Sequence, residues 1–416
     1  MGAWISTNGV VTGSKKRTCS QKSQRSVCFL EVESGVGIMQ AKRVRYFDIA
    51  KGIAILCVVL GHSALIARGW VPSRLADWLT SFCFSFHMPL FFLLSGYFMH
   101  PGRAFRWRRE STELLLTYAI TACAVVAGGA MFSALLDVEL QPEAGLRVAK
   151  SWAEAAFYGA GDVSPLTLWP VENRIGAVWF LLALFWAHLL LHWCWRFRMP
   201  MIPVVACFVI GYVSSRMVWL PWSIQAGMCA VLFLYIGQLA REHRVLDWLD
   251  SHRWMWLMSA VLWVADIIWA RGLSMAINQY GPHPALAVVG SLAGTICIIG
   301  LSRLVDTHVD ALGRVLSLAG RTSLAILCVH LVEDDVFPWG RVLAVLQSWN
   351  AWVPMTISFF LIRLALDVAC AAVLYRIPVV NRWFYPQLSR VAGNGDTDKM
   401  QVPIQGNGIS EVASCH

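Results

Sequence analysis

Charged side chains are scarce in this sequence of 416 residues. Asp, Glu, Lys and Arg together make up 14% of it, against 57% hydrophobic and 12% aromatic residues. Roughly 25% of the residues in an ordinary soluble domain are charged, so this composition excludes that class. The sequence instead indicates an integral membrane protein, whose first partner is the lipid bilayer.

Paired cysteines are lacking as well. The twelve cysteines include no CxxC pair, and most of them lie singly in apolar stretches. We interpret them as small buried hydrophobic residues, which excludes a disulfide framework or a zinc site. No secretory signal precedes the first apolar run, because residues 1–42 are polar and that run is long and uninterrupted. A fixed-period repeat is not visible either, which weakens the case for a transporter built from inverted halves.

The formal net charge is +9, yet its distribution argues against a nucleic-acid partner. The apolar runs place most Lys and Arg residues on one side of the membrane. This positive-inside pattern puts both termini in the cytoplasm. We therefore expect a multi-pass protein of the inner (cytoplasmic) membrane.

Hydropathy predicts an all-α fold with about ten transmembrane helices, because one span takes about 20 apolar residues. Residues 1–42 are expected to be a polar cytoplasmic extension, 43–386 the transmembrane domain and 387–416 a disordered cytoplasmic tail. Whether residues 1–38 are translated in the cell stays open. Segment 137–175 is the longest predicted excursion outside the membrane, a partly ordered lid over an outer opening. The predicted spans cover about residues 45–65, 78–99, 111–136, 176–195, 201–215, 223–240, 254–270, 284–304, 316–331 and 354–375.

The predicted first span carries Asp48, Lys51 and His62 on one helical stripe. At about 100° per residue, the turn from Lys51 to His62 returns to within about 20° of the same face. A charge near the middle of a span costs roughly 2.5–3.5 kcal/mol, so such residues usually face a cavity or a partner. His62 suits a general base acting on an alcohol. A structural histidine bonded to a backbone carbonyl is the alternative.

The predicted second span contains His87 close to a proline. Pro89 removes one helical hydrogen bond and clashes with the carbonyl of Ser85, so we expect a kink there. The kink could turn His87 toward the cavity that contains His62. Ser95 and Gly96, further along the span, are expected to let a neighbouring helix approach closely.

Arg106, Arg108 and Arg109 follow the predicted second span. The positive-inside rule alone accounts for arginines at the inner end of a span. These three could also clamp a phosphorylated donor, because planar guanidinium groups bind phosphate oxygens in pairs. The sequence leaves both interpretations open.

Trp179, His330 and Glu333 are further candidates on the acceptor side. Trp179 could line the cavity or anchor a helix end at the membrane interface. His330 and Glu333 could orient the base or the acceptor, or they could form a cap at the outer surface. The sequence does not decide between these alternatives.

Other polar residues in apolar stretches are expected to have structural roles. His188 and His192 have the i, i+4 spacing of a metal site, but no third ligand is identified nearby, so we predict no metal. Asp266, Arg363 and Asp367 are intramembrane polar groups that could pair with one another.

Four features taken in order resemble the membrane-bound acyltransferase-3 family. They are Lys51 with His62 after ten intervening residues, the stretch FHMPLFFLLSGY from Phe86 to Tyr97, the pair Arg106-x-x-Arg109, and Gly320…Ser323…His330. The resemblance covers residues 43–385. Within the family, the sequence is similar to the branch of fucose 4-O-acetylase-like and related glycan O-acetyltransferases. Lys51 departs from the family pattern, in which arginine is common and binds more strongly in a bidentate way. A fused esterase-like domain is not expected after the last span, so the membrane part should complete the reaction.

The resemblance implies a bundle of about ten helices that moves an acetyl group from cytoplasmic acetyl-CoA to a hydroxyl outside. In this picture His62 is the catalytic base, Lys51 is its paired basic residue, and Arg106 and Arg109 contact the CoA phosphates. The acceptor is expected to be an extracytoplasmic glycan or glycolipid. The exact acceptor and the choice between acetyl and another short acyl group stay open.

Topology suggests a mechanism for this predicted reaction. The arginines lie inside, whereas His62 and His87 fall in the outer halves of their helices, so the pantetheine arm of the donor would thread the gap. His62 would take the acceptor proton during direct transfer, or it would carry the acyl group transiently. A carrier or flippase for a lipid-linked glycan or acylated metabolite is the alternative function, and a sensor or scaffold is a third. The oligomeric state is open and includes a homo-oligomer.

Overall fold

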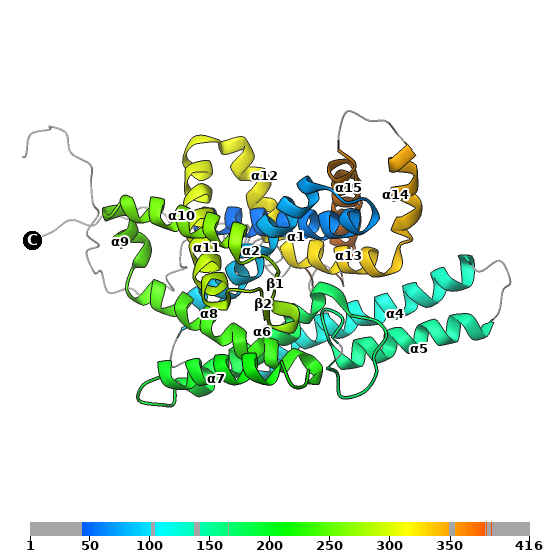
Figure 1. Ribbon diagram of the computed structural model, residues 1–416, viewed down its shortest axis with the longest axis horizontal. Coiled ribbons are helices and arrows are strands. Elements are labelled where there is room, and N and C mark those ends of the chain that lie inside the picture. Colours follow the sequence, from blue (N-terminus) through cyan, green and yellow to red (C-terminus); the bar gives the residue numbers. More distant parts are fainter. Residues whose placement is uncertain are drawn as a thin grey trace, which may run out of the picture. The chain divides into compact units, whose positions relative to one another are not determined.

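The computed structural model describes residues 44–100, 105–136, 142–164, 166–348, 354–378, 380 and 384 (Figure 1). Most of these residues are helical. The expected extension at residues 1–42 and the expected tail at 387–416 lie outside the described residues, so those domain limits stay predictions.

The helices and strands follow one another along the described chain. They are α1 (Arg45–Trp70), α2 (Arg74–Phe98), α3 (Trp107–Glu110), the π-helix η1 (Ser111–Leu116), α4 (Thr117–Leu136), α5 (Pro142–Tyr158), the 3-10 helix η2 (Gly176–Val178), α6 (Trp179–Cys194), α7 (Met201–Ser214), η3 (Pro221–Ser223), α8 (Ile224–Glu242), α9 (Val245–Ser251), α10 (Trp254–Trp269), β1 (Leu273–Ser274), η4 (Met275–Ile277), β2 (Gln279–Tyr280), α11 (Pro284–His308), α12 (Asp310–Arg321), α13 (Ser323–Val336), α14 (Trp339–Ser348) and α15 (Met355–Arg376).

Every predicted span coincides with a helix or a helix pair. Among the described residues, seven helical segments are long and apolar enough to cross a membrane, and the bent pair α12–α13 makes an eighth if it is one span. The helices at the two remaining positions, α7 and α10, have 14 and 16 residues. The all-α membrane fold is therefore confirmed, whereas the number of spans and the side of the termini stay predictions.

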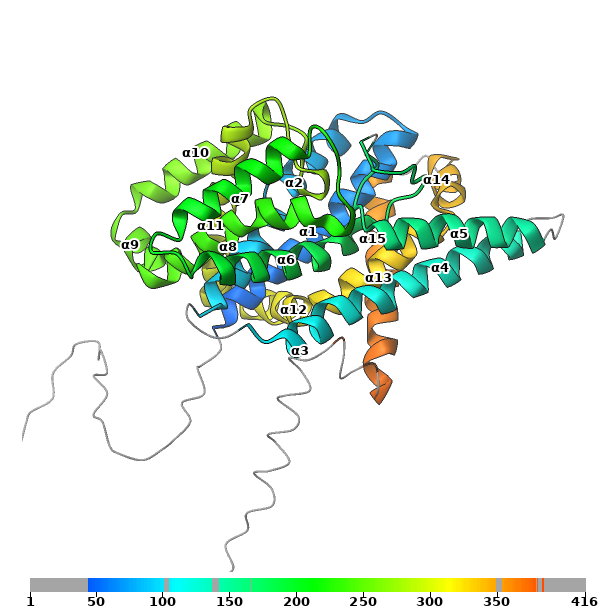
Figure 2. The ribbon, with the colours of Figure 1, turned by 90° about the horizontal axis from the view of Figure 1, so that it is seen from below.

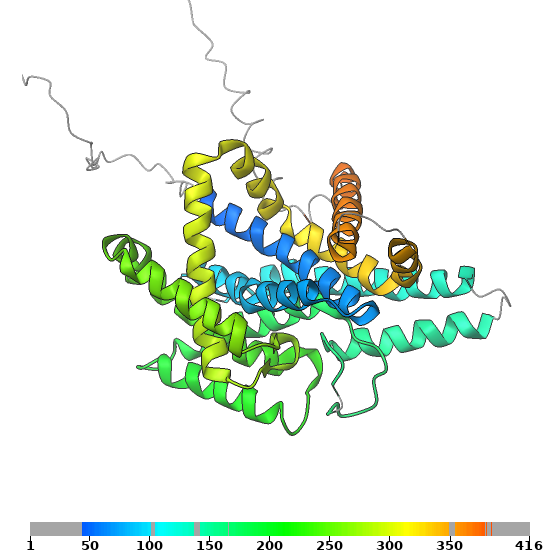
Figure 3. The ribbon, with the colours of Figure 1, turned by 45° about the horizontal axis from the view of Figure 1, so that its top comes forward.

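The predicted ninth span, residues 316–331, is not one straight helix. The chain bends by 67° between α12 and α13. Before the bend α12 packs against α1, and after it α13 contacts α4 and α15. Figure 3 shows α1 (dark blue) between α2 (light blue) and the yellow segment that contains α12. The bend brings α13 alongside the far end of α1.

Glycines set the closest helix contacts of α1 and α2. A Cβ added to Gly320 of α12 would overlap the carbonyl of Asp48, and one added to Gly52 of α1 would overlap the carbonyl of Leu316. Gly96 of α2 lies in the same way against a backbone carbonyl of α8. The expected close approach at Ser95 and Gly96 is therefore confirmed, and small residues are what permits it.

Segment 137–175, the predicted partly ordered lid, contains a long helix within its described residues. Its first part contains α5, which lies beside α4 in an antiparallel pair (Figures 1 and 2). The Tyr118 hydroxyl of α4 donates a hydrogen bond to the Ala156 carbonyl at 2.6 Å. The chain then loops, and the Ile175 amide returns to donate to the Ala160 carbonyl at 2.9 Å. The loop between those two residues supplies part of the site described below.

The short hairpin β1–β2 is held against the helices by Asn278. This residue has a positive φ of 54°, a conformation that asparagine tolerates better than most residues. Its side-chain amide donates to the carbonyls of Gly211 at 3.2 Å and Gln225 at 2.9 Å. The hairpin is thereby fixed to α7 and α8.

Candidate active site

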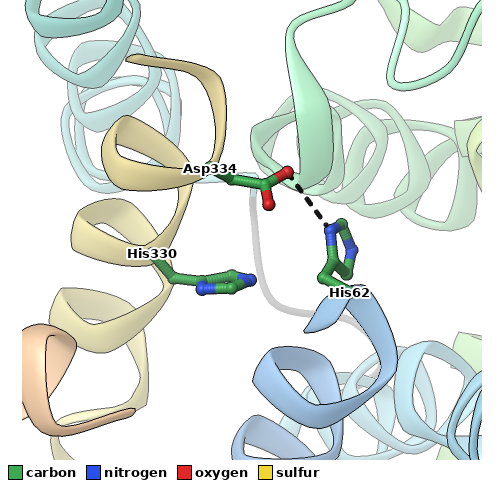
Figure 4. A group of neighbouring side chains, drawn as sticks. All are labelled: His62, His330 and Asp334. Atoms are coloured by element: carbon green, nitrogen blue, oxygen red, sulfur yellow. Dashed lines mark ion pairs between the residues drawn. The ribbon is translucent and has the colours of Figure 1, made fainter. Parts of the chain in front are cut away.

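His62 and His330 face each other between α1 and α13 (Figure 4). Their rings are nearly perpendicular, with centroids 5.3 Å apart. Asp334, one turn after His330, places its Oδ2 atom 3.5 Å from Nδ1 of His62. The Asp334 side chain is 1% exposed and that of His62 is 10% exposed. A carboxylate facing Nδ1 favours a proton on that nitrogen, which leaves Nε2 of His62 as the basic atom.

His330 is held by two further carboxyl groups. Its Nδ1 atom lies 2.7 Å from Oε1 of Glu333 and 3.1 Å from Oδ2 of Asp367. Because ionised carboxylates only accept hydrogen bonds, Nδ1 must carry a proton. Nε2 of His330 is buried without a hydrogen-bond partner among the described residues. His330 and Glu333 are therefore in direct contact, whereas their role in orienting a base stays a prediction.

Two arginines neutralise part of this carboxylate cluster. The Nε and Nη2 atoms of Arg363 on α15 lie 2.9 Å and 2.6 Å from Oε1 of Glu333, and Nη2 also contacts Asp334. Nη2 of Arg174, from the loop after α5, lies 3.7 Å from Oδ2 of Asp334. Arg363 is fully buried. A buried charge of this kind persists only when it is paired and hydrogen-bonded.

The charges of this cluster leave room for protons. Glu333, Asp334, Asp335 and Asp367 contribute four carboxyl groups, whereas Arg174 and Arg363 contribute two guanidinium groups. The two facing imidazoles supply the remaining capacity for positive charge. A net charge in a low-dielectric interior is costly. Protons bound to the imidazoles or carboxyl groups would balance the excess negative charge, so the cluster is suited to accept and return protons.

A cavity of about 50 Å³ adjoins His62. Besides His62, its lining includes His87, Trp179, Asp162 and Arg174. Nδ1 of His87 donates to the Cys83 carbonyl at 2.5 Å, so Nε2 is the nitrogen that stays available. The structure thus brings His62, His87 and Trp179 together at one cavity, which is one of the alternatives that the sequence left open for His87 and Trp179. It also adds Asp162 and Arg174 from segment 137–175.

Lys51 lies away from this cavity. Its ammonium group is 3.8 Å from Asp48 and 5.5 Å from the centre of the Phe98 ring. The rise of about 1.5 Å per residue separates Lys51 from His62 by about 16 Å along α1. Lys51 therefore lies near the Arg45 end of α1. At this distance it does not pair directly with His62.

The three candidate arginines lie at the start of α3. Arg106 and Arg108 are exposed, whereas Arg109 is half-buried. Nε of Arg109 lies 2.8 Å from Oε1 of Glu113. The structure thus leaves two exposed guanidinium groups and one partly paired group at the end of the bundle opposite His62, near Phe98.

His188 joins three helical segments near these arginines. Nε2 of His188 lies 2.7 Å from the hydroxyl of Ser95 on α2, and Nδ1 lies 2.9 Å from Oε2 of Glu110 on α3. Both ring nitrogens of His188 are hydrogen-bonded, so neither is free to bind a metal together with His192. The contact instead anchors the segment that carries the arginines.

Two groups of side chains have the composition of a metal site. They are His62, His330 and Asp334, and His330, Glu333 and Asp367, with ligand atoms within 4.8 Å of one another. Arg363 contacts Glu333 and Asp334 directly, and a guanidinium at that distance opposes a bound cation. The geometry suits an ion-pair network better than a metal, and the expectation of no metal stays a prediction.

The model of the family described as the acyltransferase domain matches residues 44–375. The chain belongs to the acyltransferase-3 family. Comparisons with curated proteins and with solved structures give no significant match. The match covers nearly all the residues on which the resemblance was drawn, whereas the narrower glycan O-acetyltransferase branch stays a prediction.

This acyltransferase is a multi-pass membrane protein, and its site contains residues that sequence reasoning did not assign to it. Asp334 could have been found, because it stands four residues after His330 on the same helical face. The sequence left open that Arg363, Asp367 and Asp266 pair with one another. In the structure Arg363 forms ion pairs with Glu333 and Asp334, Asp367 forms one with His330, and Asp266 lines a different cavity.

Proposed function

We propose that this acyltransferase moves an acetyl group from cytoplasmic acetyl-CoA to a hydroxyl of an extracytoplasmic glycan or glycolipid, with His62 as the general base. The supporting observation is the arrangement of His62 itself. Asp334 faces Nδ1 of the ring, and the small cavity adjoins the same side chain. An acceptor hydroxyl in that cavity would meet the basic nitrogen.

The proposed transfer needs one proton relay. The acceptor hydroxyl gives its proton to Nε2 of His62 while its oxygen attacks the thioester carbonyl carbon. The carbon–sulfur bond then breaks, and the CoA thiolate recovers the proton from the imidazolium of His62. Asp334 stabilises that imidazolium during the step. A general base of this kind typically contributes about 10²–10⁴-fold in rate.

In this proposal the donor binds at the end of the bundle opposite His62. Arg106, Arg108 and Arg109 bind the CoA phosphates, for which guanidinium groups are suited, and Lys51 contributes charge at the same end. Along α2 about 12 Å separates His87 from Ser95 at ~1.5 Å per residue, a gap the extended pantetheine arm spans. Packed aromatic rings occupy this stretch, with those of Phe92 and Phe180 4.9 Å apart. The arm must therefore displace them or pass beside them.

The remaining candidates act on the acceptor side. Trp179 packs at the cavity wall, where a ring face suits the apolar face of a sugar. His330 and Glu333 hold the carboxylate cluster beside His62 and so position the base. A transient acyl-histidine at His62 is the variant mechanism, and ping-pong kinetics would favour it over direct transfer.

Radiolabelled acetyl-CoA added to inside-out membrane vesicles tests the proposal. Label should appear in the extracted glycan and glycolipid fractions with the wild-type protein. His62→Ala should abolish this transfer at equal protein level in the membrane, whereas His308→Ala, which removes an exposed histidine, should not. Unchanged transfer by His62→Ala would remove His62 from the mechanism. Transport of a glycan without any acetylation would favour a carrier or flippase instead.

A further inference from the structure

A second and larger cavity lies next to the one that adjoins His62 and shares lining residues with it. Its volume is about 460 Å³, within the range of roughly 300–1,000 Å³ typical of small-molecule sites. It is formed by the Trp70 end of α1, the Arg74 end of α2, the end of α10 and the β1–β2 hairpin. The two cavities share the lining residues Leu65, Phe84, Asp162, Leu273 and Ser274.

The lining of this second cavity is rich in polar groups of both signs. Three carboxyl groups, four hydroxyl groups, two guanidinium groups and one amide take part. They belong to Asp77, Asp162, Asp266, Thr80, Ser81, Ser85, Ser274, Arg68, Arg271 and Gln279. Donors and acceptors are thus interleaved without a dominant positive charge. Such a lining suits a neutral polyhydroxyl compound and opposes a phosphorylated one, because the carboxylates would repel it.

Asp266 is the strongest indication that a ligand belongs here. It sits in the apolar helix α10 and is 3% exposed, and its Oδ2 atom has no hydrogen-bond partner among the described residues. A buried carboxylate oxygen without a partner is costly. The facing helix makes room for it at Gly290, where an added Cβ would overlap the Asp266 side chain. The fold therefore accommodates a carboxylate oxygen to which no described residue donates a hydrogen bond.

We infer that this cavity binds a neutral sugar unit of the acceptor, and that Asp266 accepts hydrogen bonds from its hydroxyl groups. This inference rests on the proposed function. It adds the position at which the acceptor binds. A sugar held there places a neighbouring hydroxyl beside the shared lining residues, on the side that faces the His62 cavity. The fixed hairpin, tied down by Asn278, keeps that wall in place.

Kinetics with separate donor and acceptor variation test the inference. The full chain in lipid nanodiscs is given radiolabelled acetyl-CoA and a panel of neutral methyl hexosides. Asp266→Asn should raise the KM for the preferred hexoside about tenfold, as the loss of one charge-assisted hydrogen bond predicts, and leave the KM for acetyl-CoA unchanged. Asp247→Asn, an exposed carboxyl on α9, is the matched control. Gln279→Ala, at an exposed position, should raise the same acceptor KM by a smaller factor and covers the case in which Asp266→Asn does not fold.

A binding measurement separates this inference from the proposed transfer. Ser81→Cys places a thiol in the cavity, and Ser251→Cys places one on exposed α9. The preferred hexoside should slow maleimide labelling at residue 81 but not at residue 251. Protection without any acetyl transfer would support the sugar site and overturn the proposed function. An unchanged acceptor KM in both cavity variants together with no protection would overturn the inference, as would stronger protection by glucose 6-phosphate.

Discussion

The imidazole of His62 and the carboxylate of Asp334 lie 3.5 Å apart and join α1 to α13. The same carboxylate also contacts Arg363 from α15 and Arg174 from the loop after α5. Asp334 therefore connects four segments that are far apart in the sequence. One carboxylate orients the proposed base and holds the surrounding elements together.

Replacing Asp334 by Asn should reduce turnover. The amide cannot stabilise an imidazolium at His62, so we expect kcat to fall by about 10²-fold or more, within the range for a lost general base. The KM for acetyl-CoA should change little. The measurement is transfer per amount of monodisperse protein after size-exclusion chromatography. Asp335→Asn changes the adjacent carboxyl group and should be far milder, because the ion pair with His62 is made by Asp334. Equal losses in the two variants would contradict a specific role for Asp334.

Replacing Arg363 by Met should lower stability. The side chain keeps its approximate length, but Glu333 and Asp334 lose their guanidinium partner. Breaking a buried ion pair from one side costs about 3–5 kcal/mol, so the melting temperature in detergent should fall clearly. Arg341→Met, at an exposed position of α14, is the control. Adding Glu333→Gln to Arg363→Met should recover part of the loss, and a melting temperature equal to wild type would contradict the pairing.

The positions of the helices could be predicted from the sequence more readily than the ion pairs around His62. Hydropathy located all ten helix positions, and the stripe on α1 singled out His62 because an ionisable group in an apolar span is rare. The partners of His62 depend on the bend between α12 and α13. The residue at the bend is Thr322, and neither a glycine nor a proline there marks the bend in the sequence. Arg174 comes from a loop without a readable motif. Only tertiary packing decides which buried acid meets which base.

His188→Ala should weaken donor binding. The imidazole connects Ser95 to Glu110 and so anchors the start of α3, where the candidate arginines lie. We expect the KM for acetyl-CoA to rise several-fold, while the acceptor KM stays unchanged. His188→Gln, which keeps one donor and one acceptor, should recover part of the affinity, and His192→Ala is the neighbouring control. A rise confined to the acceptor KM would show that the anchor does not serve the donor.

Removal of divalent metals should leave activity unchanged. Arg363 occupies the face of Glu333 and Asp334 that a cation would need. Dialysis against EDTA, followed by the transfer assay with and without added Zn²⁺, tests this. Activity lost on dialysis and restored by zinc would mean that the cluster holds a metal after all.

Gly320→Ala should disturb the site through helix packing alone. In the interior of a helix alanine is favoured over glycine by about 1 kcal/mol, so local helix propensity predicts stabilisation. The new Cβ would instead overlap the Asp48 carbonyl and push α12 away from α1. Since α12 leads directly into α13, this shift would also separate His62 from Asp334. We therefore expect less monodisperse protein and reduced turnover in the fraction that folds. Gly69→Ala, where nothing lies within 4 Å of the added Cβ, should retain both, and equal behaviour of the two variants would mean that α1 and α12 are not held as closely as described.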